Sequence, residues 1–263
     1  MRQKSTRARP DTARAAPLLV CGVIAGPLFV VVFLITGATR AGYDPLRHPV
    51  SSLALGDLGW TQVATFVVAG ALTVAFAVGL RRALRPFGGS TWGPVLVGVW
   101  GAGLIGAGVF VTDPISGYPQ GTPGRLTQYG SAHAALHDVV SLLAFVALVA
   151  ACFVFARRFA GWGSPLWAAY SAVTGIVFTG AFVLAGMGFE QTEGLVDVAG
   201  LFQRISITAG WCWLSLLALR LLRGQEIGDR AGGDGAGFPE RYPPPRGKPP
   251  KGKTAESSGH GAP

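Results

Sequence analysis

Two histidines and an aspartate open an apolar segment near the middle of the chain. In the stretch SAHAALHDVVS, His133 and His137 stand four residues apart and Asp138 follows directly. Two histidines at this spacing lie on one face of a helix and are able to provide two ligands to zinc. The spacing alone is a weak signal, and the Glu that follows the first His in zinc-protease helices is replaced here by Ala134.

Helix geometry divides this stretch into two faces. His133, His137 and Ser141 share one face, whereas Asp138 is turned by about 100° from His137. Arg204 and Asp138 each lie about 8 Å from the start of their apolar segments at 1.5 Å per residue. These segments enter from the same side, so we expect Arg204 and Asp138 to form an ion pair.

Further polar side chains gather in the segments that connect the apolar runs. They are Asp44, Arg47, His48, Ser51, Ser52, Asp113, Glu190, Glu193, Asp197 and Gln203. Ionisable residues within a membrane are costly, and each is therefore a candidate for function. Asp44 and Asp113 each precede a proline, a pair that is typical of a helix stop. Ser51 or Ser52 is expected to cap a short surface helix.

The amino-acid composition indicates that the elements carrying these residues are those of a membrane protein. The 263-residue chain is 50% hydrophobic and only 13% charged, with a mean hydropathy of +0.43. Soluble proteins carry about 25% charged residues, so the chain is typical of membrane proteins. Its net charge of +9 lies mostly in the tails and short connections, which argues against nucleic acid as a partner. Cys21, Cys152 and Cys212 fall within apolar runs and are expected to be packing residues.

Six apolar stretches are long enough to cross a bilayer, which takes about 20 helical residues. They are residues 16–37, 60–80, 92–112, 132–156, 165–189 and 199–222. We therefore predict an all-α fold, a six-helix transmembrane bundle spanning 16–222. A basic tail (1–15) precedes it. A Gly-, Pro- and Lys-rich tail (223–263) follows, whose composition is typical of disorder.

The distribution of Lys and Arg predicts how the bundle lies in the membrane. Cationic residues are concentrated in both tails and after the second and fourth stretches. Because cytoplasmic segments carry the excess of Lys and Arg, we expect both termini to be cytoplasmic. The connections 38–59, 113–131 and 190–198 would then be extracytoplasmic, and the protein would be a multi-pass protein of the cell membrane.

Four segments carry a resemblance to a known family. They are DPLRHPVSSLALGDLGW, TDPISGYPQGTP, HDVVSLLAF and GLFQR. Over residues 15–222 the chain resembles the bacterial six-helix membrane proteins grouped as Domain of Unknown Function 998, and HPVSS is the most distinctive segment. The resemblance implies a six-helix integral membrane protein without a settled activity. Its recurrent polar positions fall on His48, Ser51, Asp113, His137 and Arg204.

These observations lead to one function and leave two alternatives open. We expect a polar site at the extracytoplasmic face that binds a lipid headgroup or small polar ligand. The candidate ligand-binding residues are His48, Ser51, Asp113, His137, Asp138 and Arg204. One alternative is a metal-dependent hydrolase of membrane lipids, and the other is a small transporter. The residues leave open whether the protein is an enzyme.

We expect no cofactor at this site. The alternative is zinc held by His48, Asp113, His133 and His137, where a metal would lower the pKa of bound water to about 7. A single haem bound through His48 is a further alternative. Oligomeric state and ligand identity are not encoded in any motif that we recognise.

Overall fold

The computed structural model describes residues 15–85, 91–125 and 130–230, with side chains as far as residue 224. In this part of the chain the long elements are six α-helices, each long and apolar enough to cross a membrane. They are α2 (Ala16–Thr39), α3 (Gly59–Leu84), α4 (Trp92–Val109), α5 (Ala132–Gly161), α6 (Pro165–Phe189) and α7 (Ala199–Arg230). The predicted all-α, six-helix fold is confirmed.

The helices begin close to the predicted starts, but several end later than predicted, among them α5 at Gly161 and not at residue 156. Helix α7 continues to Arg230, past the predicted end at residue 222. Arg, Gln and Glu in this extension are good helix formers, and the first proline beyond it is Pro239. The basic tail lies outside the described residues up to residue 14, and so does the C-terminal tail from residue 231.

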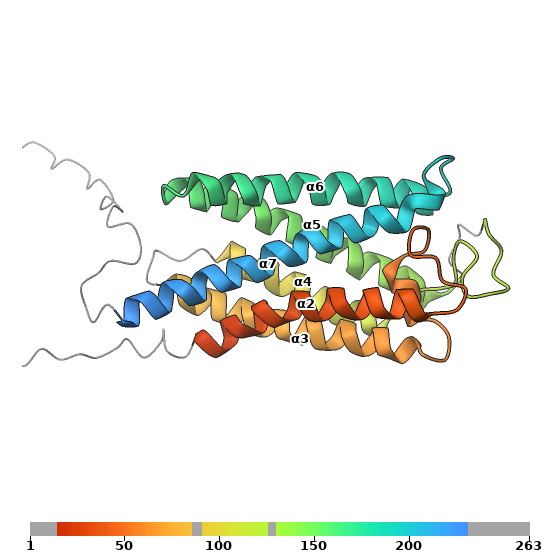
Figure 1. Ribbon diagram of the computed structural model, residues 1–263, viewed down its shortest axis with the longest axis horizontal. Helices are drawn as coiled ribbons and strands as arrows, with labels where there is room; N and C mark the ends of the chain where they lie inside the picture. Colours follow the sequence, from red (N-terminus) through yellow and green to blue (C-terminus); the bar gives the residue numbers. More distant parts are fainter. Residues whose placement is uncertain (1–14, 86–90, 126–129, 231–263) are drawn as a thin grey trace, which may run out of the picture.

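The six helices form a closed ring. Each helix packs against its neighbour in the chain, and α2 also packs against α7. Figure 1 shows the helices running along one axis, with the two ends of the helical part, Ala16 and Arg230, at the same end of the bundle. The described residues of the connections 40–58, 110–125, 130–131 and 190–198 lie at the other end, which we call the polar-loop end.

Small residues allow the backbones of α3 and α4 to approach closely. A Cβ added at Gly70 would lie 2.6 Å from the carbonyl oxygen of Gly101, and one added at Gly101 would lie 2.9 Å from that of Gly70. Lipid is as apolar as a leucine side chain, so helices in a membrane associate through such close packing. This contact fixes the α3–α4 pair along one side of the ring.

Aromatic side chains fill the middle of the ring. Trp100 of α4 and Trp211 of α7 meet with ring centroids 5.6 Å apart, and Phe29 of α2 lies 5.4 Å from Trp211. All three are almost fully buried. Their edge-to-face and tilted arrangements are those that aromatic pairs prefer. They close the interior below the polar-loop end.

Candidate functional site: a loop network and an adjoining cavity

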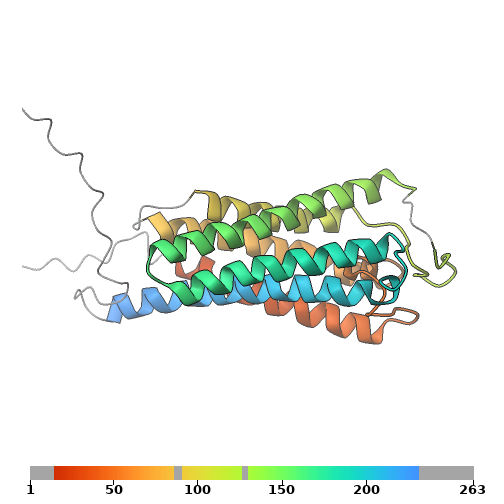
Figure 2. The same cartoon turned by 90° about the horizontal axis from the view of Figure 1, so that it is seen from above.

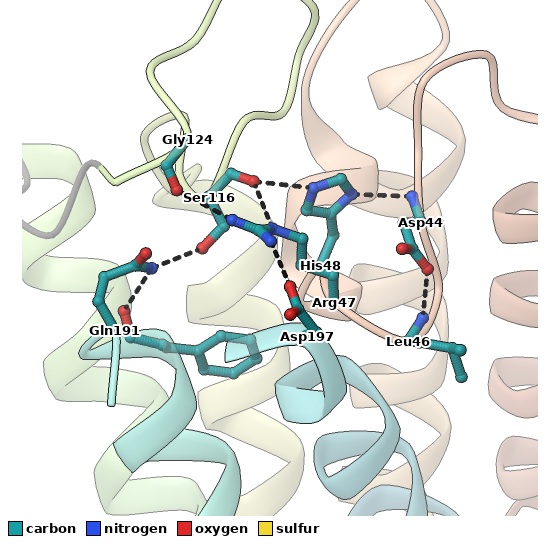
Figure 3. A network of polar contacts seen from close by, with 9 residues as sticks. Asp44, Leu46, Arg47, His48, Ser116, Gly124, Gln191 and Asp197 are labelled. Atoms are coloured by element: carbon teal, nitrogen blue, oxygen red, sulfur yellow. Dashed lines mark hydrogen bonds and ion pairs between the residues drawn. The ribbon is translucent and has the colours of Figure 1, made fainter. Parts of the chain in front are cut away.

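His48 is the centre of a polar network that joins two loops at the polar-loop end (Figure 3). Its Nδ1 accepts a hydrogen bond from the backbone N–H of Asp44 at 2.8 Å. Its Nε2 lies 3.1 Å from the carbonyl oxygen of Ser116, and because a carbonyl only accepts, Nε2 must donate. His48 is buried, and this burial lowers its pKa. Both ring nitrogens are therefore used by a neutral imidazole.

Arg47 joins the same loop to two others. Its Nε donates to the carbonyl oxygen of Ser116 at 3.0 Å, and one terminal nitrogen donates to that of Gly124 at 3.0 Å. The other terminal nitrogen forms an ion pair with Asp197, which Figure 3 shows reaching toward it from the last loop. Ser116 has a φ of 57°, a left-handed conformation that is uncommon outside glycine. Through its bonds to Ser116, Gly124 and Asp197, the Arg47 guanidinium thus holds three loops in one arrangement.

Arg204 secures the start of α7 to this network. It donates to the carbonyl oxygens of His48 and Gly200, both at 3.0 Å, and to the hydroxyl of Tyr43. Burial raises the pKa of Tyr43 to about 12, although the adjacent Arg204 acts in the opposite direction. The backbone N–H of Leu201 donates to a further loop carbonyl, that of residue 46, at 2.9 Å. The first turn of α7 is therefore docked on the loop that carries HPVSS.

Asp113 performs a separate task at the start of α5. Its carboxylate accepts hydrogen bonds from the backbone N–H groups of Gly130 and Ser131 and from the Ser131 hydroxyl, at 2.8–3.0 Å. The Ser131 hydroxyl in turn accepts from the backbone N–H of Ala134 and so caps the helix. A negative charge at a helix N-terminus is stabilising. Asp113 therefore fixes where α5 begins.

A cavity of about 280 Å³ lies beside this network, inside the ring of helices. Aromatic side chains form much of its wall: Phe29, Phe66, Trp100, Phe145, Phe182 and Phe189. Polar side chains also line it: Ser51, His137, Asp138, Ser141, Glu190 and Gln203. Small-molecule sites commonly have volumes of about 300–1,000 Å³, so this cavity suits a small ligand or one end of a larger one.

Two polar residues of the lining are held in place by hydrogen bonds to the protein, and each keeps one further atom that is able to form a hydrogen bond. His137 is 5% exposed, and its Nδ1 lies 2.6 Å from the carbonyl oxygen of Phe110 and 3.2 Å from that of Ala107. Gln203 is 9% exposed, and its amide oxygen accepts from the backbone N–H of Val50 at 2.7 Å. His137 Nε2 and the Gln203 amide nitrogen have no hydrogen-bond partner in the described part of the chain.

The other four polar residues of the lining are less constrained. Asp138, Glu190, Ser51 and Ser141 form no side-chain hydrogen bond within residues 15–85, 91–125 and 130–224. Asp138 and Glu190 are exposed, and the two serines are partly exposed. The cavity thus has polar groups available to a ligand, in contrast to the network beside it.

The cavity opens between α5 and α6. The exposed or half-exposed residues of its lining on these two helices include Asp138, Leu142 and Gly186, with Leu142 53% exposed. The lining residues from α2, α3 and α7 are buried or nearly so. Figure 1 and Figure 2 both show α5 and α6 close together at their short connection and diverging toward the polar-loop end. Phe145 and Phe182, with ring centroids 4.4 Å apart, mark where the two helices meet.

The six residues singled out from the sequence divide between the two regions. Ser51, His137 and Asp138 line the cavity. His48, Asp113 and Arg204 are used in the hydrogen bonds described above and are not part of its lining. The six residues therefore lie at the same end of the bundle, but they do not converge on one pocket.

The expected ion pair between Arg204 and Asp138 is not formed. Within the described residues the ion pair present is that of Arg47 with Asp197, and Arg204 instead bonds Tyr43 and two carbonyl groups. Equal depth on two helices was not enough, since a depth estimate says nothing about which face of α7 meets which neighbour.

The alternative zinc site is not assembled either. Its residues, His48, Asp113, His133 and His137, bond different neighbours, and His133 is exposed and packs on Phe110. In the described part of the chain no group of three or more His, Cys, Asp or Glu side chains is placed to hold a metal ion.

The predicted serine cap is wrong as well. The short helix is a 3-10 helix, η1 (Val50–Ala54), which follows Pro49 and has no side-chain cap. The Ser52 hydroxyl is buried without a hydrogen-bond partner among the described residues. The backbone N–H of Val50 is bonded instead by Gln203 from α7, a partner too distant in the sequence to be anticipated.

The family of the chain can now be stated. A family model described as "Protein of unknown function (DUF998)" matches residues 23–220. The chain belongs to this family. Neither a search of curated proteins nor a search of solved structures returned a similar protein. The resemblance drawn from the sequence is therefore confirmed, and so is the expectation of a membrane protein with six apolar helices.

In this DUF998 protein the distinctive HPVSS segment has a visible structural task. The His48 ring and carbonyl join two loops and α7, the N–H of Val50 bonds α7, and Ser51 borders the cavity. Sequence reasoning missed Tyr43 and Ser116, which complete the network. It also missed the aromatic wall, because Phe and Trp in apolar helices carry no sign of whether they face lipid or a cavity.

Proposed function

We propose that this DUF998 protein binds an amphiphilic molecule, a lipid or a small polar ligand with an apolar part, in the cavity between α5 and α6. One observation carries the proposal: the cavity combines an aromatic wall with polar side chains that lack protein partners. Ligand sites in proteins are typically apolar with a few placed polar groups.

Energetics support this proposal. Polar and ionisable groups at membrane depth are costly unless they are hydrogen-bonded, and they are normally paired. Arg47, His48 and Arg204 follow this rule through the bonds of the loop network. Asp138 and the Nε2 atom of His137, both on α5, are without such partners among the described residues. A ligand whose polar end meets these side chains would offset part of that cost.

The position of the opening supports an approach from the membrane. Asp138 lies six residues after the start of α5, about 9 Å along its axis at 1.5 Å per residue. Phe145, at the closed side of the opening, is about 10 Å further along. We propose that Asp138 lies near the boundary between headgroups and acyl chains, so that an amphiphile would enter sideways with its polar end toward the membrane surface.

A filling substitution tests the proposal directly. A Cβ at Gly186, which lines the cavity, would meet no atom within 4 Å, so Gly186→Leu is expected to fold while occupying the opening. Gly180→Leu is the matched control, because Gly180 lies on the same helix, is equally free of contacts and is not part of the lining.

The measurement is native mass spectrometry of the purified protein with decanol as the probe. We expect one decanol bound to the unsubstituted protein and to Gly180→Leu, and about tenfold weaker binding to Gly186→Leu, a loss of about 1.4 kcal/mol. Equal binding to both variants, or no saturable binding to any of the three proteins, would overturn the proposal.

We also propose that the polar-loop end faces away from the cytoplasm in the cell membrane. Arg81 and Arg82 in the last turn of α3 and Arg158 in that of α5 lie at the opposite end, which is typical of the cytoplasmic side. A reporter that is active only outside the cytoplasm is expected to be active when fused at Gly121. A reading on the cytoplasmic side would contradict this orientation.

A further inference from the structure

We propose that the polar end of the molecule bound in this cavity is cationic, a protonated amine. This inference rests on the proposed function and specifies the chemical class of its ligand. The sequence led us to expect a lipid headgroup or a small polar ligand and did not specify its charge.

The charges that line the cavity are negative. Asp138 and Glu190 carry carboxylates, and among the residues that the structure describes no Lys or Arg belongs to the lining. Arg204, at the start of α7, has its guanidinium committed to Tyr43 and to two carbonyl groups. An anionic headgroup would therefore meet repulsion without a compensating cation, whereas an ammonium group would meet two partners.

Three neutral side chains of the lining are able to accept a hydrogen bond: His137, Ser51 and Ser141. His137 Nδ1 faces two carbonyl oxygens and must carry the hydrogen, so Nε2 of the neutral ring is an acceptor. Ser51 and Ser141 accept as well as donate. An ammonium group has three donors and no acceptor, which matches this set.

Gln203 provides independent evidence that a ligand belongs here. Its side chain is 9% exposed and lines the cavity, its oxygen is bonded by Val50, and its amide nitrogen has no partner in the described part of the chain. This nitrogen is not among the fully enclosed unpaired atoms, so it is accessible from the cavity and able to donate to a ligand. A hydroxyl or carbonyl oxygen next to the amine of the ligand would satisfy it.

The aromatic wall is compatible with a cation. Phe182 and Phe189 of α6 line the same cavity as the two carboxylates. The face of an aromatic ring attracts a cation through its electrostatic quadrupole. The wall thus accommodates both the alkyl part of an amphiphilic amine and the edge of its charged group.

The test compares three probes with the same chain and different charge: decylamine, decanol and decanoate. Native mass spectrometry at pH 7 of the full-length protein gives the affinity for each. We expect decylamine to bind about tenfold more tightly than decanol, and decanoate to bind most weakly. The double variant Asp138→Asn/Glu190→Gln is expected to lose this preference for the amine while keeping its affinity for decanol.

The control variant removes two negative charges from the same end but outside the cavity. Asp57 and Glu193 are exposed loop residues that are not part of the lining. Asp57→Asn/Glu193→Gln should retain the preference for decylamine, which separates a local effect from a general surface potential. Binding of decanol to the cavity variant also shows that it is folded.

The outcomes separate this inference from the function on which it rests. Saturable binding of decanol that Gly186→Leu abolishes, without tighter binding of decylamine, would overturn the cationic class alone. Tightest binding of decanoate would overturn it too. An amine preference lost equally in both double variants would assign it to surface charge and refute the inference. Failure of all three probes to bind would overturn the proposed function itself.

Discussion

The loop network and the cavity contain similar polar residues. They differ in how many hydrogen bonds these residues form with the protein. In the network, His48 uses both ring nitrogens and Arg204 donates to three oxygens. In the cavity, Asp138 is without a hydrogen-bond partner in the described residues and His137 uses one nitrogen. The difference indicates that polar residues in a membrane protein divide into those that hold the structure and those that remain available to a ligand.

Their positions in the chain explain this difference. The network joins loops that are far apart in sequence, and it borders the first turn of α7. Most polar residues of the cavity lie on helices, with His137, Asp138 and Ser141 on α5 and Gln203 on α7. Loops lack regular backbone hydrogen bonding, so their conformation must be fixed by hydrogen bonds from side chains. A helix positions a side chain through its backbone, and the polar atoms of that side chain stay available.

The largest effect is expected where α7 docks on the HPVSS loop. A Cβ at Gly200 would lie 2.5 Å from the carbonyl oxygen of His48 and 2.7 Å from that of Pro45, both backbone atoms. Gly200→Ala should therefore destabilise the protein by about 3 kcal/mol, the upper part of the range for overpacking. Denaturant titration in mixed micelles measures this loss.

Gly180→Ala is the control for this substitution, because a Cβ at Gly180 meets no atom within 4 Å. It should leave the free energy of unfolding unchanged or slightly higher. If Gly200→Ala were as stable as Gly180→Ala, the docking of α7 on the loop would not be a fixed feature of the fold.

A smaller effect is expected from removing one polar side chain in each region. Arg204→Met removes three hydrogen bonds donated by a charged group, which should cost about 2–3 kcal/mol. Asp138→Asn is nearly isosteric and removes no bond of the described structure, so it should cost less than about 0.5 kcal/mol.

Thermal unfolding of the two variants, side by side with the unsubstituted protein, provides the comparison. A large loss of stability in Asp138→Asn would mean that the carboxylate has a structural partner. That result would erase the distinction between the two regions and weaken the proposed ligand site.

A further effect, below that of Gly200→Ala and Arg204→Met near neutral pH, concerns the pH dependence of stability. Burial lowers the pKa of His48, so at a given acidic pH a smaller fraction of this side chain is protonated in the folded state than in the unfolded state. Stability should be complete above pH 6.5, the ordinary His value, and should fall as the pH drops below it. One proton limits the slope to about 1.4 kcal/mol per pH unit. The added proton would face the N–H of Asp44 and break that bond.

His48→Asn keeps a side-chain acceptor and removes the titrating group, so its stability should depend less on pH between 7 and 5. His133→Asn, on an exposed residue of α5, should behave as the unsubstituted protein does. An unchanged pH profile in His48→Asn would show that the acid sensitivity arises elsewhere.

Particular residues show how far the sequence allowed the site to be predicted. The polar-loop end and the importance of HPVSS were both predictable, because polar residues are rare in this chain and cluster near helix ends. The pairing of Arg204 with Tyr43 and the role of Gln203 were not, because they depend on how α7 is rotated against the loop. His137 and Asp138 are turned away from each other by about 100°. Both nevertheless border the cavity, because it is wide enough to reach two faces of α5.

The sequence by itself determined that this is a six-helix membrane protein, where its helices run and at which end its polar residues gather. Those properties depend on hydropathy and spacing along one chain, which are local quantities. Only the tertiary structure decided which polar groups are satisfied by one another and which border a cavity with an aromatic wall. That division depends on the closing of the ring by α2 and α7 and on the divergence of α5 from α6, contacts between residues distant in sequence.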